Sequence, residues 1–222
     1  MENSLLIVGA GGHCESVLDA IPRDAYSNIT LSDLPLRVGL CVMGIPITAT
    51  DDDWENIYNA GRRYAFVALG SVSDPSKRIR IYQRLKQIGF SFPVIIDPTA
   101  VVSKNAVLEP GIFVGKKAVI NTQASIGECA IINTAAVIEH GCVLGEFVHV
   151  APGACLAGNV EVGPKAHIGI GAVVVEGVRI GAEAVLGAGA VATQNIPAGC
   201  IAVGVPARPI KTVGQKISEK II

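Results

Sequence analysis

Aliphatic residues recur at every sixth position between residues 96 and 186, without a break in register. Alanine stands four residues after most of these positions, as at Ala118 and Ala136, and glycine often follows directly, as at Gly127 and Gly145. A period of six fits neither an α-helix, with a period of about 3.6, nor an alternating strand, with a period of about two. The sixteen aliphatic positions are Ile96, Val102, Leu108, Val114, Ile120, Ile126, Ile132, Ile138, Leu144, Val150, Leu156, Val162, Ile168, Val174, Ile180 and Leu186.

This repeat predicts a parallel β-helix built from hexads. Each hexad supplies one short strand and one corner, so three hexads complete a triangular coil and the whole repeat makes about five coils. The aliphatic side chain points into the prism, the small residue packs beside the corner, and glycine or a polar residue lets the chain turn. Stacked coils lie about 4.8 Å apart and bury each other's faces.

The chain before the repeat has a different pattern. Residues 4–8 form an apolar run that predicts a buried strand, followed by Gly9-Ala-Gly-Gly-His13 and a predicted helix to about residue 21. A strand, a glycine-rich turn and a helix bring free backbone amides close to a phosphate group. The dinucleotide fingerprint is incomplete because Cys14 stands where its third glycine belongs, so an ordinary tight turn remains an alternative.

Further elements complete a small α/β region. Strands are predicted over residues 29–33 and 64–71, and helices over 51–60 and 77–89, with Thr50 as a helix N-cap. We therefore expect a Rossmann-like α/β domain with a small parallel sheet over residues 1–90. A β-helix domain with a C-terminal cap follows over residues 91–222, and its last residues, 210–222, are expected to form a short helix or tail.

Composition narrows the class of protein. Half of the residues are hydrophobic but only 5% are aromatic, which suits a thin prism filled by aliphatic side chains. The net charge of -1, with scattered basic residues, gives no sign of a nucleic-acid surface. Six cysteines without a Cys-x-x-Cys pair favour reduced packing thiols and a cytoplasmic protein. No signal peptide or membrane-spanning run is apparent.

Several stretches resemble a known family. They are residues 132–150, Ala151-Pro-Gly-Ala154, Ala157-Gly-Asn-Val-Glu-Val-Gly163 and Gly204-Val-Pro-Ala-Arg208. They are similar to the hexapeptide-repeat acyltransferases of the sialic acid O-acetyltransferase and bacillosamine-type nucleotide-amino-sugar N-acetyltransferase family, and the resemblance covers nearly the whole chain. It implies a left-handed β-helix, a homotrimer, and transfer of acetyl from acetyl-CoA to a UDP-4-amino-sugar-type acceptor.

The resemblance makes His140 the general base. Its place in the hexad points outward, and a neutral imidazole, with a reference pKa of about 6.5, can take a proton from an attacking amine or hydroxyl. In the bacillosamine-type enzymes an acidic residue follows the base, whereas here Gly141 follows it. Glu139 and Glu146 are the nearest acids, and neither holds the family position.

Other residues match the acetyl-CoA site. The resemblance places His149 against the acetyl group and assigns Gly158, Ile170 and Ala188 to the acetyl-CoA groove, which in the family lies between neighbouring subunits. The spacing of eighteen should stack Gly158 on His140, where its amide can serve the developing oxyanion. The same spacing should stack His149 and His167, and His167, which has no family match, is interpreted as a solvated corner residue.

A third group of residues matches the nucleotide-sugar site. Gly11, Gly12 and His13 correspond to the turn that holds the nucleotide sugar in the family. Two acids end the second strand in the family, whereas Ser32 and Asp33 stand here, so the identity of the nucleotide is open. The set also includes Gly70, at the end of the strand of residues 64–71, and Arg78, which matches a family arginine but for which a solvated helix residue is the more common interpretation.

Other functions are possible on the same fold. O-acetylation of sialic acid or another sugar is the alternative within the family. A zinc hydratase would need three convergent histidines, of which His140, His149 and His167 are candidates, but the His-x4-His spacing is absent and no metal is expected. A covalent mechanism through Cys142 or Cys155 and a non-catalytic scaffold complete the alternatives.

Overall fold

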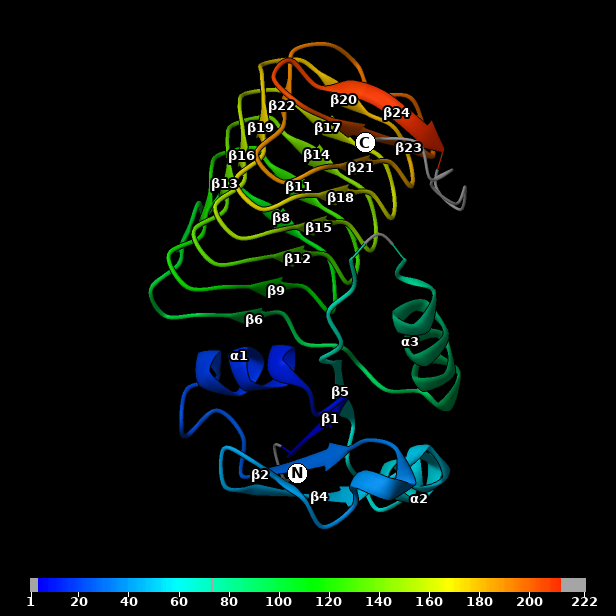
Figure 1. The fold of residues 1–222 in the computed structure, drawn as a ribbon. Helices are drawn as coiled ribbons and strands as arrows, with labels where there is room; N and C mark the ends of the chain where they lie inside the picture. Colours follow the sequence, from blue (N-terminus) through cyan, green and yellow to red (C-terminus); the bar gives the residue numbers. More distant parts are fainter. Residues whose placement is uncertain (1–3, 73, 213–222) are drawn as a thin grey trace.

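The computed structural model describes residues 4–72 and 74–212 and consists of an α/β domain beside a triangular prism (Figure 1). Within these ranges a five-stranded sheet runs in the order β3-β4-β2-β1-β5, in which β4, β2, β1 and β5 are parallel and β3 pairs antiparallel with β4. The predicted α/β region with a parallel sheet is therefore confirmed, with a short hairpin that the sequence did not reveal. The strands are β1 (Ser4–Val8), β2 (Asn28–Ser32), β3 (Cys41–Val42), β4 (Ile45–Ala49) and β5 (Tyr64–Val67).

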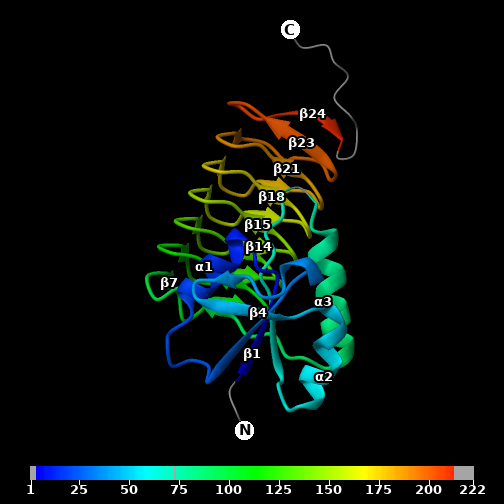
Figure 2. The same cartoon turned by 60° about the horizontal axis from the view of Figure 1, so that its bottom comes forward.

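Helices cover both faces of this sheet (Figures 1 and 2). The side chains of β1 alternate between the faces: Leu5 and Ile7 pack with the helix α1 (Gly12–Ala20), whereas Leu6 and Val8 pack with α2 (Trp54–Asn59) and α3 (Ser76–Ile88). The central strand is consequently buried on both sides, which explains its continuous apolar sequence. No helix in the described part of the chain is long and apolar enough to cross a membrane.

The predicted helix over residues 51–60 begins as a 3₁₀ turn. Short 3₁₀ helices span Pro35–Arg37 and Asp51–Asp53, and the second leads directly into α2. The backbone amide and hydroxyl of Thr50 both donate to Oδ2 of Asp53, at 2.8 and 3.0 Å. Thr50 therefore fixes the start of the helix, as expected from the sequence.

The hexads form a parallel β-helix whose strands stack at a spacing of eighteen residues, as in Ile120 beside Ile138. In the described residues the strands form three sheets. Sheet 1 contains β7 (Val101–Val102), β10 (Val119–Ile120), β13 (Val137–Ile138), β16 (Cys155–Leu156), β19 (Val173–Val174) and β22 (Val191–Ala192). Sheet 2 contains β8 (Val107–Leu108), β11 (Ser125–Ile126), β14 (Val143–Leu144), β17 (Glu161–Val162) and β20 (Arg179–Ile180). Sheet 3 contains β6 (Ile95–Ile96), β9 (Phe113–Val114), β12 (Ile131–Ile132), β15 (His149–Val150), β18 (His167–Ile168), β21 (Val185–Leu186), β23 (Cys200–Val203) and β24 (Arg208–Thr212).

The glycine after each aliphatic residue has a different role from the one predicted. At the corners, the residue three positions after the aliphatic one has a left-handed φ. Some of these residues are glycines, and others, such as Lys117 and Gln123, carry side chains. Glycines such as Gly127 have no left-handed φ, but a Cβ on Gly127 would lie 2.6 Å from the amide nitrogen of Glu146. Glycine stands there because the next coil passes too close for a side chain.

The two ends of the prism differ. Ile96 is 37% exposed and Val102 and Leu108 are half-buried, although all three were expected inside, because no earlier coil covers them. At the other end β23 pairs with β21 and then antiparallel with β24. Of the short helix or tail expected over residues 210–222, residues 210–212 form no helix but belong to β24, and residues 213–222 lie outside the described part of the chain.

The α/β domain packs against the outer face of sheet 3. Ile95, Phe113 and Ile131 point away from the prism and join the apolar core formed by α1. Ion pairs join Lys116 to Asp19 and Lys86 to Glu128 across the same junction. This docking brings the loop after β5 beside the outward residues of β15 and β18.

Candidate functional site

His140 lies at the corner between sheets 1 and 2, and its side chain is exposed, as its place in the hexad predicts. Its Nδ1 lies 3.3 Å from Oε2 of Glu139, which also accepts a hydrogen bond of 3.2 Å from the His140 backbone amide. These bonds hold the pKa of the Glu139 carboxyl below its usual value. A carboxylate at Nδ1 favours the tautomer that carries its proton on Nδ1, which leaves Nε2 free as a base.

Gly158 stacks on His140 in the next coil. A Cβ on Gly158 would lie 2.6 Å from Cε1 and 2.7 Å from Nε2 of the imidazole, so any side chain would displace the ring. No acceptor among the described residues takes the Gly158 backbone hydrogen. The corner thus holds a base and a free amide donor beside each other, which are the two groups that an acyl transfer needs.

Gly141 completes this corner. It has a φ of +67°, and a Cβ there would lie 2.3 Å from Oδ1 of Asn159. A side chain after the base would therefore require Asn159 to move, and the acid beside the imidazole is Glu139, the residue before it.

The second pair of histidines is buried on the outer face of sheet 3. His149 and His167 are paired in neighbouring strands, with ring centroids 4.9 Å apart. The interpretation of His167 as a solvated corner residue is wrong: it is 7% exposed, in a strand, because the loop after β5 and the His149 ring cover it. Its Nδ1 has no hydrogen-bond partner among the described residues, and burial lowers its pKa.

The bonds of His149 define its tautomer. Its Nδ1 lies 2.8 Å from the carbonyl oxygen of Ser71, which can only accept, so Nδ1 carries the proton. Burial lowers the pKa of His149 to about 4, so the ring is neutral at pH 7 and Nε2 accepts from the amide of Asn133 at 3.3 Å. Ser71 was not identified from the sequence, because its contact with His149 depends on how the domains dock. Asn133 was not identified either, although it lies within the β-helix, just after the strand that pairs with β15.

An apolar cavity of about 280 Å³ opens beside these histidines, at the corner between sheets 3 and 1. It contains three of the four residues assigned to acetyl-CoA, His149, Ile170 and Ala188, together with His167 and the exposed Val72 of the loop after β5. Gly158 is not among them, because it lies with His140 at the corner opposite sheet 3. Within one chain, the base and most of the residues assigned to the acyl donor therefore lie at different corners of the prism.

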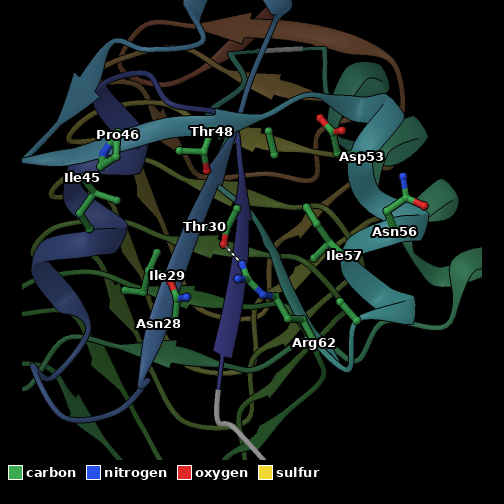
Figure 3. Close-up of a pocket in the computed structure, with 12 residues that line it drawn as sticks. Asn28, Ile29, Thr30, Ile45, Pro46, Thr48, Asp53, Asn56, Ile57 and Arg62 are labelled. Atoms are coloured by element: carbon green, nitrogen blue, oxygen red, sulfur yellow. Dashed lines mark hydrogen bonds between the residues drawn. The ribbon is translucent and has the colours of Figure 1, made fainter.

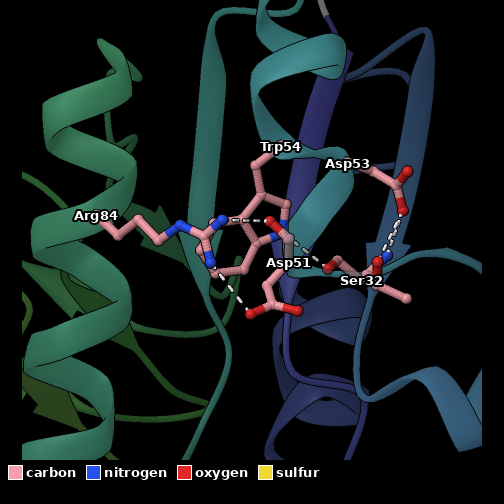
Figure 4. A network of polar contacts seen from close by, with 6 residues as sticks. Ser32, Asp51, Asp53, Trp54 and Arg84 are labelled. Carbon is pink, nitrogen blue, oxygen red and sulfur yellow. Dashed lines mark hydrogen bonds and ion pairs between the residues drawn. The ribbon is translucent and has the colours of Figure 1, made fainter.

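A second cavity, of about 230 Å³, lies at the carboxyl ends of β1 and β2, between α2 and α3. Ser32 and Asp33 both line it, and neither is free of partners. Trp54 donates its indole hydrogen to Ser32 Oγ at 2.8 Å (Figure 4), and Asp33 Oδ2 accepts from the Ala10 amide at 2.8 Å and from Arg37 at 2.8 Å. Through its bond to the Ala10 amide, Asp33 thus fixes the glycine-rich turn at the edge of the cavity.

The glycine-rich turn lies at the start of α1. Gly11 and Gly12 are exposed, have no left-handed φ, and a Cβ on either would meet no atom within 4 Å. His13 lies beneath them, with its ring edge-on to Phe113 at 5.0 Å and its Cβ 3.7 Å from the position of a Cβ on Gly70. Burial, reinforced by Arg78 and His149, lowers the pKa of His13 to about 3.

Arg78 is not the solvated helix residue that the sequence allowed. It is 3% exposed, donates to Ser71 Oγ at 3.3 Å and to the carbonyl oxygen of Cys129, and lies over the Phe147 ring. Burial lowers its pKa to about 10. Because Arg78 shares the inward face of α3 with Tyr82 and Leu85, it holds the helix against the β-helix and does not line the cavity at Ser32.

A larger hollow of about 570 Å³ lies between β2, β4 and α2 (Figure 3). Thr30, Thr48, Asn56 and Arg62 are among its lining residues, and Arg62 donates to the Thr30 hydroxyl. None of the residues assigned from the sequence lines it. The described residues contain no group of three metal-ligating side chains, and His140 lies at a different corner from His149 and His167, so the three histidines of a zinc hydratase do not converge.

Residues 4–85 match the family model described as the PglD N-terminal domain. The chain is 35% identical to PerB from Caulobacter crescentus, solved with CoA and GDP-perosamine, with 94% of this chain and 97% of that chain covered and a TM-score of 0.87. Two further structures are of variants of that perosamine N-acetyltransferase in which one histidine is replaced by asparagine or alanine.

The acetyltransferase domain of PglB from Neisseria gonorrhoeae, solved in complex with acetyl coenzyme A, is 33% identical, with 95% of this chain and all of that chain covered (100%) and a TM-score of 0.85. WeeI from Acinetobacter baumannii is 22% identical over 93% of this chain and 99% of that chain, with a TM-score of 0.72, and supports the fold. The expected left-handed parallel β-helix after a parallel-sheet domain is confirmed.

Proposed function

Because the chain belongs to the family of nucleotide-amino-sugar N-acetyltransferases, we propose that it transfers acetyl from acetyl-CoA to the amino group of a nucleotide-linked amino sugar, with His140 as the general base. The observation that carries the assignment of the base is the stack of His140 against the free amide of Gly158. The enzyme is an acyltransferase that uses acetyl-CoA as co-substrate.

The groups at this corner can accept and return the proton that the reaction moves, and can stabilise the negative charge that develops. His140 Nε2 takes the proton of the amine as its nitrogen attacks the thioester carbon, and Glu139 stabilises the imidazolium that forms. The Gly158 amide donates to the carbonyl oxygen, which becomes negative in the tetrahedral intermediate. When the C–S bond breaks, His140 returns the proton to the leaving thiolate, so no acyl-enzyme is formed.

The two halves of the site come from neighbouring chains in this proposal. His140 and Gly158 lie at the corner opposite sheet 3, whereas the apolar cavity with His149, Ile170 and Ala188 lies where sheet 3 meets sheet 1. A cyclic trimer of prisms lets the corner of one chain face the cavity of the next, in three equivalent clefts. Val143 and Ile170, both more than half exposed, provide apolar contact area for such packing.

The acceptor is assigned to the α/β domain of residues 1–90, and acetyl transfer to the β-helix of residues 91–222. The residues assigned to the acceptor are Gly11, Gly12, His13, Ser32, Asp33, Gly70 and Arg78. Of these, Arg78 acts only indirectly, because it holds α3 against the β-helix and does not line the cavity at Ser32. The free thiols of the six cysteines suit a reducing compartment, so we place the protein in the cytoplasm.

The test is release of CoA thiol from acetyl-CoA by the purified protein with UDP-, GDP- and dTDP-linked amino sugars. Turnover with one of them, lost in His140→Ala and His140→Asn, supports acceptor, donor and base together. Turnover with sialic acid or an unlinked sugar instead establishes the O-acetyl alternative. No turnover and no binding of acetyl-CoA would leave the protein a scaffold. Sedimentation of the same samples measures the trimer.

A further inference from the structure

Neither the family resemblance nor the acyl-transfer scheme gives His167 a role, although its ring lines the apolar cavity beside His149. Neither ring nitrogen of His167 has a hydrogen-bond partner among the described residues, and the two nitrogens differ in access. Nδ1 is enclosed by the protein, whereas Nε2 is not. Because the open space that the ring borders is the cavity of about 280 Å³, Nε2 faces a ligand that is held there.

The surroundings of His167 also place its proton. Burial lowers the pKa of the ring, so at pH 7 the ring is neutral and carries one hydrogen. A hydrogen on Nδ1 would be a buried N–H without an acceptor, which folded proteins rarely contain. A hydrogen on Nε2 can be donated into the cavity instead. A neutral imidazole in this form polarises a carbonyl group without giving up its proton.

His149 cannot supply this hydrogen bond, although the resemblance places it against the acetyl group. Its Nδ1 hydrogen is donated to the Ser71 carbonyl oxygen at 2.8 Å, and its Nε2 accepts from the Asn133 amide at 3.3 Å. The remaining residues that line the cavity are aliphatic residues, glycines and one proline, without a polar side chain. Within this lining, His167 is therefore the side chain that has a hydrogen left to donate.

We infer that His167 donates its Nε2 hydrogen to the thioester carbonyl oxygen of acetyl-CoA bound in this cavity. The inference rests on the proposed function for the position of the acetyl group. A carbonyl oxygen has two lone pairs, so it can accept from His167 of one chain and from the Gly158 amide of the neighbouring chain. Both hydrogen bonds strengthen as this oxygen becomes negative in the tetrahedral intermediate. When the C–S bond breaks the carbonyl forms again, and the imidazole keeps its proton throughout.

Three substitutions of His167 test which ring nitrogen acts. The amide nitrogen of Gln can lie near the position of Nε2, whereas that of Asn lies near the position of Nδ1. His167→Gln should retain kcat within about fivefold, whereas His167→Asn and His167→Leu should each lower kcat about 100-fold, as expected for the loss of one oxyanion donor. The thiol-release assay with the amino-sugar acceptor measures these constants.

Binding without an acceptor shows where on acetyl-CoA the contact lies. Titration calorimetry should show that His167→Leu weakens binding of acetyl-CoA about fivefold and leaves binding of CoA, which lacks the acetyl carbonyl, unchanged. Val185→Ala is the matched control, because Val185 pairs with His167 in the next coil and lines the same cavity without a polar group. It should change the affinities for acetyl-CoA and CoA by the same factor.

Equal weakening of acetyl-CoA and CoA binding in His167→Leu would overturn the inference, because the contact would then not involve the acetyl carbonyl. Equal values of kcat in the Gln, Asn and Leu variants would overturn it as well. These outcomes are separate from the proposed function. Acetyl transfer by the wild-type protein that is unaffected in His167→Leu removes the inference alone. Acetyl-CoA affinity that depends on His167, without transfer to any linked amino sugar, removes the proposed function alone.

Discussion

The Glu139 carboxylate lies 3.3 Å from Nδ1 of His140, on the residue before the base and not after it. Replacement by Gln keeps the shape but removes the charge that stabilises the imidazolium. We expect Glu139→Gln to lower kcat roughly 10-fold while the KM for acetyl-CoA stays the same, since Glu139 acts through His140. Steady-state kinetics of the thiol release measure both constants.

The matched control for this change is Glu146→Gln, which removes an exposed acid from the next hexad. It should leave kcat within about twofold, as a surface charge at high dielectric contributes little. An unchanged kcat in Glu139→Gln, or an equal loss in both variants, would mean that Glu139 does not assist the base.

Gly141 is expected to resist substitution for two separable reasons. Gly141→Ala places a Cβ 2.3 Å from Asn159 Oδ1 and also strains a φ of +67°. Gly153→Ala has the same φ but no atom within 4 Å of the new Cβ, so it measures the strain alone. Urea denaturation should show a loss of about 1 kcal/mol for Gly153→Ala. For Gly141→Ala we expect about 0.5 kcal/mol more, because the exposed side chain of Asn159 can rotate away from the new Cβ. A loss for Gly141→Ala that exceeds the loss for Gly153→Ala by about 2 kcal/mol or more would show instead that Asn159 is held in place.

Gly158→Ala tests whether the corner serves catalysis more than folding. The new Cβ would fall 2.6 Å from Cε1 of His140, and because that imidazole is exposed it can rotate away at little cost in stability. We expect the unfolding free energy to change by less than about 1 kcal/mol and kcat to fall by about 100-fold or more, as the base leaves its position. A variant with normal kcat would show that His140 need not stack on this glycine.

The spacing of eighteen explains why much of the site could be predicted. In a helix of three hexads per coil, residue i lies beside residue i+18, so the stacks of His140 with Gly158 and of His149 with His167 follow from counting. The same count does not reveal why a glycine is needed. Gly127 was expected to turn the chain, but it makes room for the next coil.

Contacts between the two domains could not be predicted in this way. His149 and Ser71 are far apart in sequence, and their bond depends on how the loop after β5 docks on sheet 3. The burial of His167 follows from the same docking. The burial of Arg78 could have been predicted from the sequence. Arg78, Tyr82 and Leu85 stand at positions i, i+4 and i+7, which place them on one face of the helix.

The buried histidines make stability depend on pH. Burial lowers the pKa of His149 to about 4, against a value of about 6.5 in the unfolded chain. Between these values the unfolded chain binds a proton that the folded chain does not, so acid favours unfolding. The stability is fully present above about pH 6.5 and falls by about 1.4 kcal/mol per pH unit for this residue as the pH drops toward 4. His13, with a pKa of about 3, acts in the same direction.

His149→Gln separates this effect from general acid denaturation. Its amide can still donate to the Ser71 carbonyl but does not titrate, so urea denaturation between pH 6 and 4.5 should show a slope smaller by about 1.4 kcal/mol per pH unit than in the wild type. The difference in slope should persist in about 0.5 M salt, which screens exposed charges, because salt does not screen the desolvation of a buried ring. An identical slope in the variant would show that His149 is protonated without unfolding, and that the loop after β5 opens to admit the charge.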